Sequence, residues 1–382
     1  MTIYYIVYII LSYLCILAYK SPSKRSYYFK WGATIMFLLL GLRSAYVGPD
    51  TFNYTICYQH PKFYYCGNPT DTGFVFLLSC FRFFFPEKEF FLLMSSLVSL
   101  WGIYYLINHE SKYKNVSLLL FGICGTGEIF YLTYFSMIRQ ACAMSFVFIG
   151  LTMYFSNHAT DKKLNLLKGV LLLQKRQFYG LVLIIFATTI HASAAIIIPF
   201  LFIARYTSIN KWIYTFIISI TYIIGALNLF SFSELFTYIS FQIKSSEHYN
   251  AYLEEMTFGE MASVGIINPL TLPFTIIALY ILWFSKTNIS KCWYLQFFLF
   301  GTILNNALTD NMMWTRLVLY FTIMAIIVIP NFLINSSLKI GKFFFLIIIA
   351  YYFYKTNNLL IYLNKINIDL NLIIPYKTWL FN

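Results

Sequence analysis

Three arginines in this sequence have the side chain and the setting to bind a phosphate-like anion. Arg43, Arg139 and Arg316 each lie at the edge of a long apolar run, in a chain that is 60% hydrophobic and only 11% charged. An arginine at bilayer depth costs about 2.5 to 3.5 kcal/mol even on the lenient insertion scale. Because its planar guanidinium can bind two phosphate oxygens at once, we expect an anionic ligand such as a pyrophosphate to offset that cost.

A turn after the first arginine would place a carboxylate beside it. Gly48 and Pro49 form a turn signal, which would bring Asp50 to the same membrane rim as Arg43. There the arginine could bind an oxyanion while the carboxylate accepts a proton or binds a sugar hydroxyl. Tyr54 follows as a candidate sugar contact. The alternative is a snorkelling Arg43 that simply pairs with Asp50.

The second arginine lies between two apolar runs and has polar neighbours on both sides. Gln140 follows Arg139 directly, and Glu128 precedes it. A helix that begins near Arg139 would add the positive end of its dipole to an anion site. We therefore expect Arg139 and Gln140 to bind pyrophosphate and Glu128 to take part in the chemistry. The alternative is an intramembrane pair of Glu128 and Arg139 with only a structural role.

Two further groups carry candidate residues at the ends of apolar runs. His191 opens a run, and a histidine can take a proton from a hydroxyl near neutral pH, although a lone histidine there is also typical of hydrogen-bonded packing. The other group combines Asp310 and Trp314 with Arg316 and Tyr320, and so repeats the pattern of acid, aromatic residue and arginine. We expect its arginine to bind pyrophosphate and its other members to contact sugar or loop.

Other kinds of chemistry have no support in the sequence. There is no cysteine–histidine cluster and no ladder of carboxylates, so we expect anion binding without a metal ion. Glycine-rich nucleotide loops are absent, so neither ATP-driven chemistry nor a cofactor is expected. The net charge of +13 comes from basic residues dispersed in short loops, which indicates membrane topology and not a nucleic-acid partner.

These residues need helices to position them, and the hydropathy of the chain predicts a polytopic all-α integral membrane protein with a single transmembrane domain over residues 1–382. Apolar runs recur near the length of roughly 20 residues that spans a bilayer. The first run has no basic leader and no cleavage site, so we expect a retained span and not a signal peptide. A short apolar stretch over 73–85 better suits a re-entrant or interfacial helix. The twelve predicted spans are 2–19, 31–46, 90–107, 117–135, 138–156, 172–190, 192–204, 212–230, 266–285, 291–308, 314–335 and 343–357.

This threading puts most of the 27 basic residues on one side, which the positive-inside rule makes cytoplasmic. Both termini are then on the outer side of the membrane. Two longer loops, about 48–72 and 231–265, face outward, and their aromatic and polar residues suit sugar faces as well as an aromatic belt with solvated linkers. Cys57 and Cys66 in the first loop could form a disulfide worth about 2 to 3 kcal/mol, although spacing alone leaves the bond open.

The order of these motifs resembles the EpsG-like family of Wzy-type polysaccharide polymerases, which make O-antigen, capsule or exopolysaccharide. Asp71 stands where that family usually has glutamate, and Pro49 stands where a small polar residue is common. The matching elements are Arg43, Gly48, Asp50 and Tyr54; Asp71-Thr72-Gly73-Phe74; Ile138-Arg139-Gln140; His191-Ala192-Ser193-Ala194; and Arg316 with Tyr320.

The resemblance implies a glycosyltransferase that works on the outer face of the bacterial inner membrane on undecaprenyl-pyrophosphate-linked oligosaccharides, with a chain-length regulator as partner. Arg139 and Arg316 would hold the departing pyrophosphate, with Arg43 in support, and His191 or Asp50 would deprotonate the acceptor hydroxyl. Two alternatives remain. A flippase would usually place charge near the midplane and show internal repeats, whereas an O-antigen ligase would differ only in its acceptor.

Overall fold

The computed structural model shows an all-helical membrane protein. Within the described part of the chain the only β-type pairing is an isolated bridge between Arg43 and Thr378. The chain divides into two units, Met1–Tyr206 with Ile329–Asn382, and Thr207–Val328. The structure describes residues 1–59, 71–126, 129–156, 175–206, 209–227, 268, 270–285, 289, 292–308, 312–334, 339–365, 373–374 and 376–381, of which 312–315, 365 and 381 are described by their backbone only.

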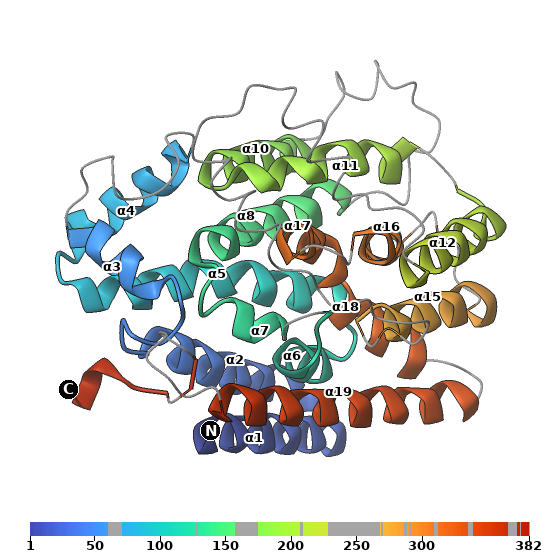
Figure 1. Ribbon diagram of the computed structural model, residues 1–382, viewed down its shortest axis with the longest axis horizontal. Helices are drawn as coiled ribbons and strands as arrows, with labels where there is room; N and C mark the ends of the chain where they lie inside the picture. Colours follow the sequence, from blue (N-terminus) through green and yellow to red (C-terminus); the bar gives the residue numbers. More distant parts are fainter. Residues whose placement is uncertain are drawn as a thin grey trace. The chain divides into compact units, whose positions relative to one another are not determined.

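Most of the helices belong to the first unit (Figure 1). In chain order they are α1 (Thr2–Lys20), η1 (Pro22–Lys24), α2 (Arg25–Gly41), α3 (Thr51–Gln59), α4 (Thr72–Phe84), α5 (Lys88–Glu110), α6 (Lys114–Ile123), α7 (Phe130–Thr133), α8 (Ile138–Phe155), α10 (Lys175–Ile190), η2 (Ala192–Ile196), α11 (Ile197–Tyr206), the π-helix η4 (Pro330–Ile334), α19 (Lys339–Lys365) and η5 (Trp379–Phe381). The second unit has α12 (Lys211–Ala226), α15 (Leu272–Phe284), α16 (Trp293–Ala307), α17 (Met312–Thr322) and α18 (Ala325–Ile329), the last residue of which lies at the boundary.

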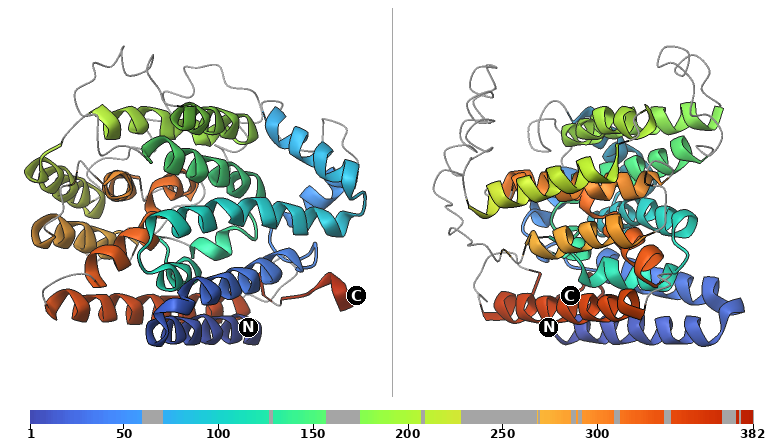
Figure 2. Two further views of the ribbon diagram at one scale, coloured as in Figure 1. Left: turned by 180° about the vertical axis from the view of Figure 1, so that it is seen from behind. Right: turned by 90° about the vertical axis from the view of Figure 1, so that its right-hand side faces the viewer.

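In the first unit the long helices pack side by side in the order α10, α8, α5, α2 and α1, and α6 packs against both α1 and α2 (Figures 1 and 2). Helix α8 lies between α10 and α5 in this order, and most of its residues are buried. Its contact with α5 is close because Gly102 of α5 has no side chain where the two helices meet. The amide of Gly102 therefore reaches Ser145 of α8 and donates to its Oγ at 2.8 Å. The helix that carries Arg139 is therefore fixed from both sides.

Five helices in the described part are long and apolar enough to cross a membrane: Thr2–Lys20, Lys88–Glu110, Ile138–Phe155, Arg316–Ile334 and Lys339–Asn364. Shorter apolar helices stand at most of the other predicted spans. The predicted short element at 73–85 is helical, as α4. The predicted loop 48–72 contains α3, while its residues 60–70 and the whole predicted loop 231–265 lie outside the described residues.

One predicted span is wrong as a continuous helix. The segment 117–135 is interrupted after α6, where Cys124 has an extended backbone (φ −86°, ψ 152°), and a short α7 follows. Glycines at 125 and 127 weaken the helix there. A break inside a membrane needs partners for its carbonyl groups, and α19 supplies them. Thr356 Oγ1 donates to the Ile123 carbonyl at 3.1 Å, and Lys355 Nζ donates to the carbonyls of Gly125 (3.0 Å) and Thr126.

Replacing Lys355 by methionine should therefore lower the free energy of unfolding by about 1 to 3 kcal/mol, because it leaves two carbonyl oxygens without their donor. Lys342→Met is the matched control, since Lys342 is an exposed lysine of the same helix. Thermal unfolding of the purified protein in detergent would measure both. Equal unfolding temperatures for the two variants would contradict this role.

In the second unit α16 is the shared partner, because α12, α15 and α17 all pack against it. Its buried Asn306 accepts a hydrogen bond from Thr275 Oγ1 of α15 at 3.0 Å and donates to the Ile218 carbonyl of α12 at 3.4 Å. Gly301 lets the backbone of α17 approach near Phe321. One amide thus ties three helices of this unit together.

Basic residues gather at one end of the first unit. Lys20, Arg25, Lys114, Lys175 and Arg205 lie where α1 and α11 end and where α2, α6 and α10 begin. Both chain termini lie at the opposite end, as the following contacts show. Tyr4 Oη donates to the Ile373 carbonyl at 2.8 Å, and the Ser44 amide donates to the Lys377 carbonyl at 2.8 Å. The C-terminal segment therefore covers the end of α2, next to Arg43.

Candidate functional site

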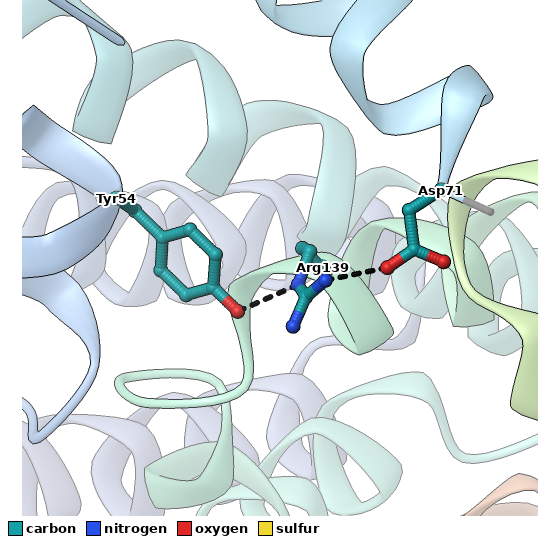
Figure 3. A network of polar contacts seen from close by, with 3 residues as sticks. All are labelled: Tyr54, Asp71 and Arg139. Carbon is teal, nitrogen blue, oxygen red and sulfur yellow. Dashed lines mark hydrogen bonds and ion pairs between the residues drawn. The ribbon is translucent and has the colours of Figure 1, made fainter. Parts of the chain in front are cut away.

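Arg139, in the first turn of α8, is the centre of a polar network at the end of the first unit that carries the chain termini (Figure 3). Its Nε donates to Tyr54 Oη at 2.8 Å, and its Nη1 lies 2.5 Å from Asp71 Oδ2. The guanidinium carbon also lies 5.6 Å from the centre of the Tyr54 ring. The Arg139 side chain is 24% exposed, whereas that of Asp71 is 5% exposed. The second terminal nitrogen, Nη2, has no hydrogen-bond partner among the described residues.

The turn at Gly48 positions Tyr54. Gly48 has a φ of +103°, which favours glycine, and a Cβ there would lie 2.3 Å from the carbonyl oxygen of Phe135. Thr51 Oγ1 donates to the same carbonyl at 2.8 Å. The start of α3 is therefore docked onto the turn that leads into α8. This close contact brings Tyr54, on α3, within reach of Arg139.

Asp71 connects Arg139 to the break that carries His191. The carboxylate accepts a hydrogen bond from the backbone N–H of Ala192 as well as from Arg139. Two residues further on, a Cβ on Gly73 would lie 2.2 Å from Thr189 Oγ1 and 2.8 Å from the Thr189 carbonyl carbon. The start of α4 thus rests directly on the end of α10. His191 follows that end with an extended backbone and a half-buried side chain.

Asp50 is half-buried in the turn before α3 and interacts electrostatically with both Arg139 and Tyr54. Among the described residues, the carboxylate of Asp50 forms no ion pair with Arg139. The ion pair that Arg139 forms there is with Asp71. Asp71 is the residue that sequence reasoning left out of the candidate site. The acidic-x-Gly-aromatic element did point to Asp71, but the spacing in the sequence gave no reason to expect its carboxylate to pair with Arg139.

Burial raises the pKa of Tyr54, while Arg139 opposes the shift. The phenol is therefore protonated at neutral pH. Because its oxygen accepts the Nε–H of Arg139, its own hydrogen points away from that bond and can be donated to a ligand oxygen.

We expect Tyr54→Phe to lower activity about tenfold, because Arg139 Nε loses its acceptor while the ring packing against Phe74 is kept. Tyr46→Phe is the matched control, since Tyr46 is 57% exposed and stacks on Phe52 outside the network. Polymer formed per unit of membrane protein would measure the effect. Equal activity of the two variants would exclude a role for the Tyr54 hydroxyl.

Arg43 is not at an open rim, where the sequence placed it. It is 1% exposed, and its guanidinium donates to the carbonyls of Leu40 (2.5 Å) and Phe135 (3.3 Å) and to Ser96 Oγ (3.4 Å). Among the described residues no carboxylate pairs with it, so the alternative of a pair with Asp50 is absent from this structure. The C-terminal segment explains the burial, because Tyr376 Oη donates to the Leu39 carbonyl and Trp379 Nε1 to the Gly41 carbonyl. A role in binding pyrophosphate would require this cover to move.

For the remaining predicted site residues, the structure shows only their burial or does not describe them. Gln140 is 4% exposed, so its amide is covered although it is next to Arg139. In the second unit, Arg316 is exposed on α17 and Tyr320 is buried on the same helix. Trp314 is described by its backbone only, and Glu128 and Asp310 lie outside the described residues. Cys57 is buried on α3, and its predicted partner Cys66 also lies outside them, so their disulfide stays a prediction.

Comparison with known proteins gives one match. The model of the EpsG family matches residues 26–378, which is most of the chain and includes every residue of the network around Arg139. No curated protein and no solved structure gives a significant match.

Proposed function

Because this chain belongs to the EpsG family, the family of Wzy-like polysaccharide polymerases, we propose that it joins undecaprenyl-pyrophosphate-linked oligosaccharide repeat units by glycosyl transfer. The observation that carries this proposal is the network of Tyr54, Asp71 and Arg139 beside the His191–Ala192 junction. Four separate segments of the chain bring a partly exposed arginine, a phenol, a carboxylate and an imidazole to one end of one unit. These are the groups needed to stabilise an anionic leaving group and to remove a proton from a hydroxyl.

In the proposed reaction the glycan leaves its lipid pyrophosphate and joins the acceptor repeat unit. The bond between the sugar's anomeric carbon and the pyrophosphate oxygen breaks, and the pyrophosphate keeps the electron pair. The acceptor oxygen forms the new glycosidic bond and gives its proton to His191 or Asp50. Arg139 binds the departing pyrophosphate through Nη2, for which the described residues provide no hydrogen-bond partner. Leaving-group stabilisation should dominate, because preorganised positive charge contributes about 10²- to 10³-fold per donor.

The orientation in the membrane is part of the same proposal. Lys20, Arg25, Lys114, Lys175 and Arg205 lie at the end opposite the network, which supports a cytoplasmic position for that end. The network and both termini would then face the periplasm of the bacterial inner membrane. Arg316, Gln140, Trp314 and Tyr320 remain proposed substrate contacts, and a chain-length regulator remains a proposed partner. Catalysis without a metal ion is also proposed.

Glycan length in a strain that lacks this gene distinguishes the proposal from its two alternatives. A polymerase predicts that deletion leaves glycans of a single repeat unit and that the wild-type gene restores the ladder on a gel. Loss of even the single-repeat glycan would favour a flippase. A polymer that still forms on its lipid carrier but is not transferred to a final acceptor would favour a ligase.

A further inference from the structure

The charge around Arg139 poses a problem for an anion site. The guanidinium is already paired with the Asp71 carboxylate at 2.5 Å, and Asp50 adds a second negative charge within electrostatic range. A pyrophosphate that bound to this arrangement would share one arginine with a buried carboxylate. Two anionic groups on one guanidinium repel each other strongly at this distance in a partly buried site.

We propose that Asp71 is the resident counter-ion of Arg139, that the pyrophosphate of the lipid-linked donor displaces it, and that the Asp71 carboxyl takes up one proton from solvent as the donor binds. This inference rests on the proposed function, since it assumes that Arg139 binds the pyrophosphate. Asp71 is a positioning residue in this account. It holds the arginine in place while the site is empty and then gives up its charge.

The surroundings of Asp71 support such an exchange. The side chain is 5% exposed, so without Arg139 its negative charge would be buried with little compensation. Among the described residues, the polar and charged groups that face it are Arg139 from α8 and the Ala192 amide from η2. Tyr54 of α3 and Asp50 of the preceding turn lie next to Arg139, and His191 precedes the amide. Of these groups, Arg139 and the amide favour the charged carboxylate.

Proton uptake follows from the direction of the pKa change. Burial raises the pKa of Asp71 in the empty site, and Arg139 and the Ala192 amide oppose that shift. Once a pyrophosphate takes over Arg139, an opposing positive charge is lost and a negative charge is added nearby. The pKa of Asp71 therefore rises further in the bound state. A group whose pKa rises on binding takes up a proton, so affinity should increase as the pH falls between the two pKa values.

The test measures binding of farnesyl pyrophosphate to the purified protein by calorimetry at a series of pH values from about 5.5 to about 8.5. Asp71→Asn removes the titrating group and keeps its shape, whereas Asp71→Glu keeps the carboxyl. His191→Gln controls for histidine titration. Because the probe itself also titrates, the readout is the difference between wild type and Asp71→Asn, and farnesyl sulfate serves as a probe of constant charge.

We expect the affinity of wild type to fall faster than that of Asp71→Asn as the pH rises. The ratio of the two affinities should change by up to about tenfold per pH unit. At the upper end of the range Asp71→Asn should bind more tightly than wild type, and Asp71→Glu should keep the wild-type slope. Should the asparagine variant not fold, farnesyl sulfate binding to wild type in two buffers of different ionisation enthalpy reports the proton uptake directly.

Equal slopes for wild type and Asp71→Asn would overturn the proposal, as would a proton uptake that disappears in His191→Gln. Weaker binding of Asp71→Asn at every pH would assign Asp71 to a purely structural role and would also overturn it. Failure of the proposed function gives a different result, because Arg139→Gln would then bind farnesyl pyrophosphate as tightly as wild type.

Discussion

Replacing Arg139 by alanine is expected to lower polymer formation about 10²- to 10³-fold at an unchanged protein level in the membrane, because it removes the exposed cation of the network. Arg139→Lys should not restore activity. The arginine donates in one direction to Tyr54 and in another to Asp71, and its third nitrogen has no hydrogen-bond partner in the described part of the chain. A lysine ammonium is a single point charge and cannot keep these three directions. The length distribution of the glycan on gels measures the loss.

Arg176→Ala is the matched control for this experiment. Arg176 is an exposed arginine near the start of α10, at the end of the first unit opposite the network. Its removal should leave the glycan ladder unchanged. A normal ladder in Arg139→Lys would show that a point charge suffices and would contradict the role of the guanidinium geometry.

Gly73→Ala is expected to cause the second large loss, although Gly73 has no functional group. A Cβ at this position would lie 2.2 Å from Thr189 Oγ1, 2.8 Å from the Thr189 carbonyl carbon and 2.9 Å from the Ile190 nitrogen. Since two of these are backbone atoms, α4 must move away from the end of α10. The free energy of unfolding should fall by about 1 to 3 kcal/mol. The same movement separates Asp71 from the Ala192 amide, so activity should fall by more than the stability loss explains.

Gly122→Ala separates this effect from a general cost of filling space. Gly122 is a buried glycine of α6, but the nearest atoms to a Cβ there lie 3.5 Å away or more, which is ordinary contact. This variant should be neutral or slightly more stable, because alanine favours a helix over glycine. Thermal unfolding and glycan length would be measured for both variants. An unfolding temperature and a glycan ladder equal to wild type in Gly73→Ala would contradict the close contact between α4 and α10.

The sequence predicted the helical class, because long apolar runs are a strong signal. The predicted spans 90–107, 138–156 and 291–308 lie close to the bounds of α5, α8 and α16. The sequence could not predict the break after α6. Apolar residues continue through 117–135, and the groups that satisfy the exposed carbonyls, Lys355 and Thr356, lie more than 200 residues away in the chain. Only the folded structure shows that a lysine inside an apolar run has this task.

The candidate site shows a similar division. Arg139, Tyr54 and His191 were predicted from their types and their places beside apolar runs, and the structure brings the segments that carry them to one end of the first unit. Asp71 was not included, because its partner Arg139 is 68 residues away. Arg43 was expected at the rim, but a C-terminal segment far along the chain covers it. Local spacing indicates which residues could do chemistry. It does not indicate which distant residues pair with them or cover them in the fold.

The most direct test of this account is polymerisation by the purified protein in proteoliposomes supplied with a radiolabelled undecaprenyl-pyrophosphate-linked repeat unit. If the protein is a polymerase that uses Arg139, lipid-linked products of two or more repeat units form, with one undecaprenyl pyrophosphate released for each new linkage, and both are lost in Arg139→Ala. Repeat units that cross the bilayer without being joined, or joining that proceeds equally well in Arg139→Ala, would contradict it.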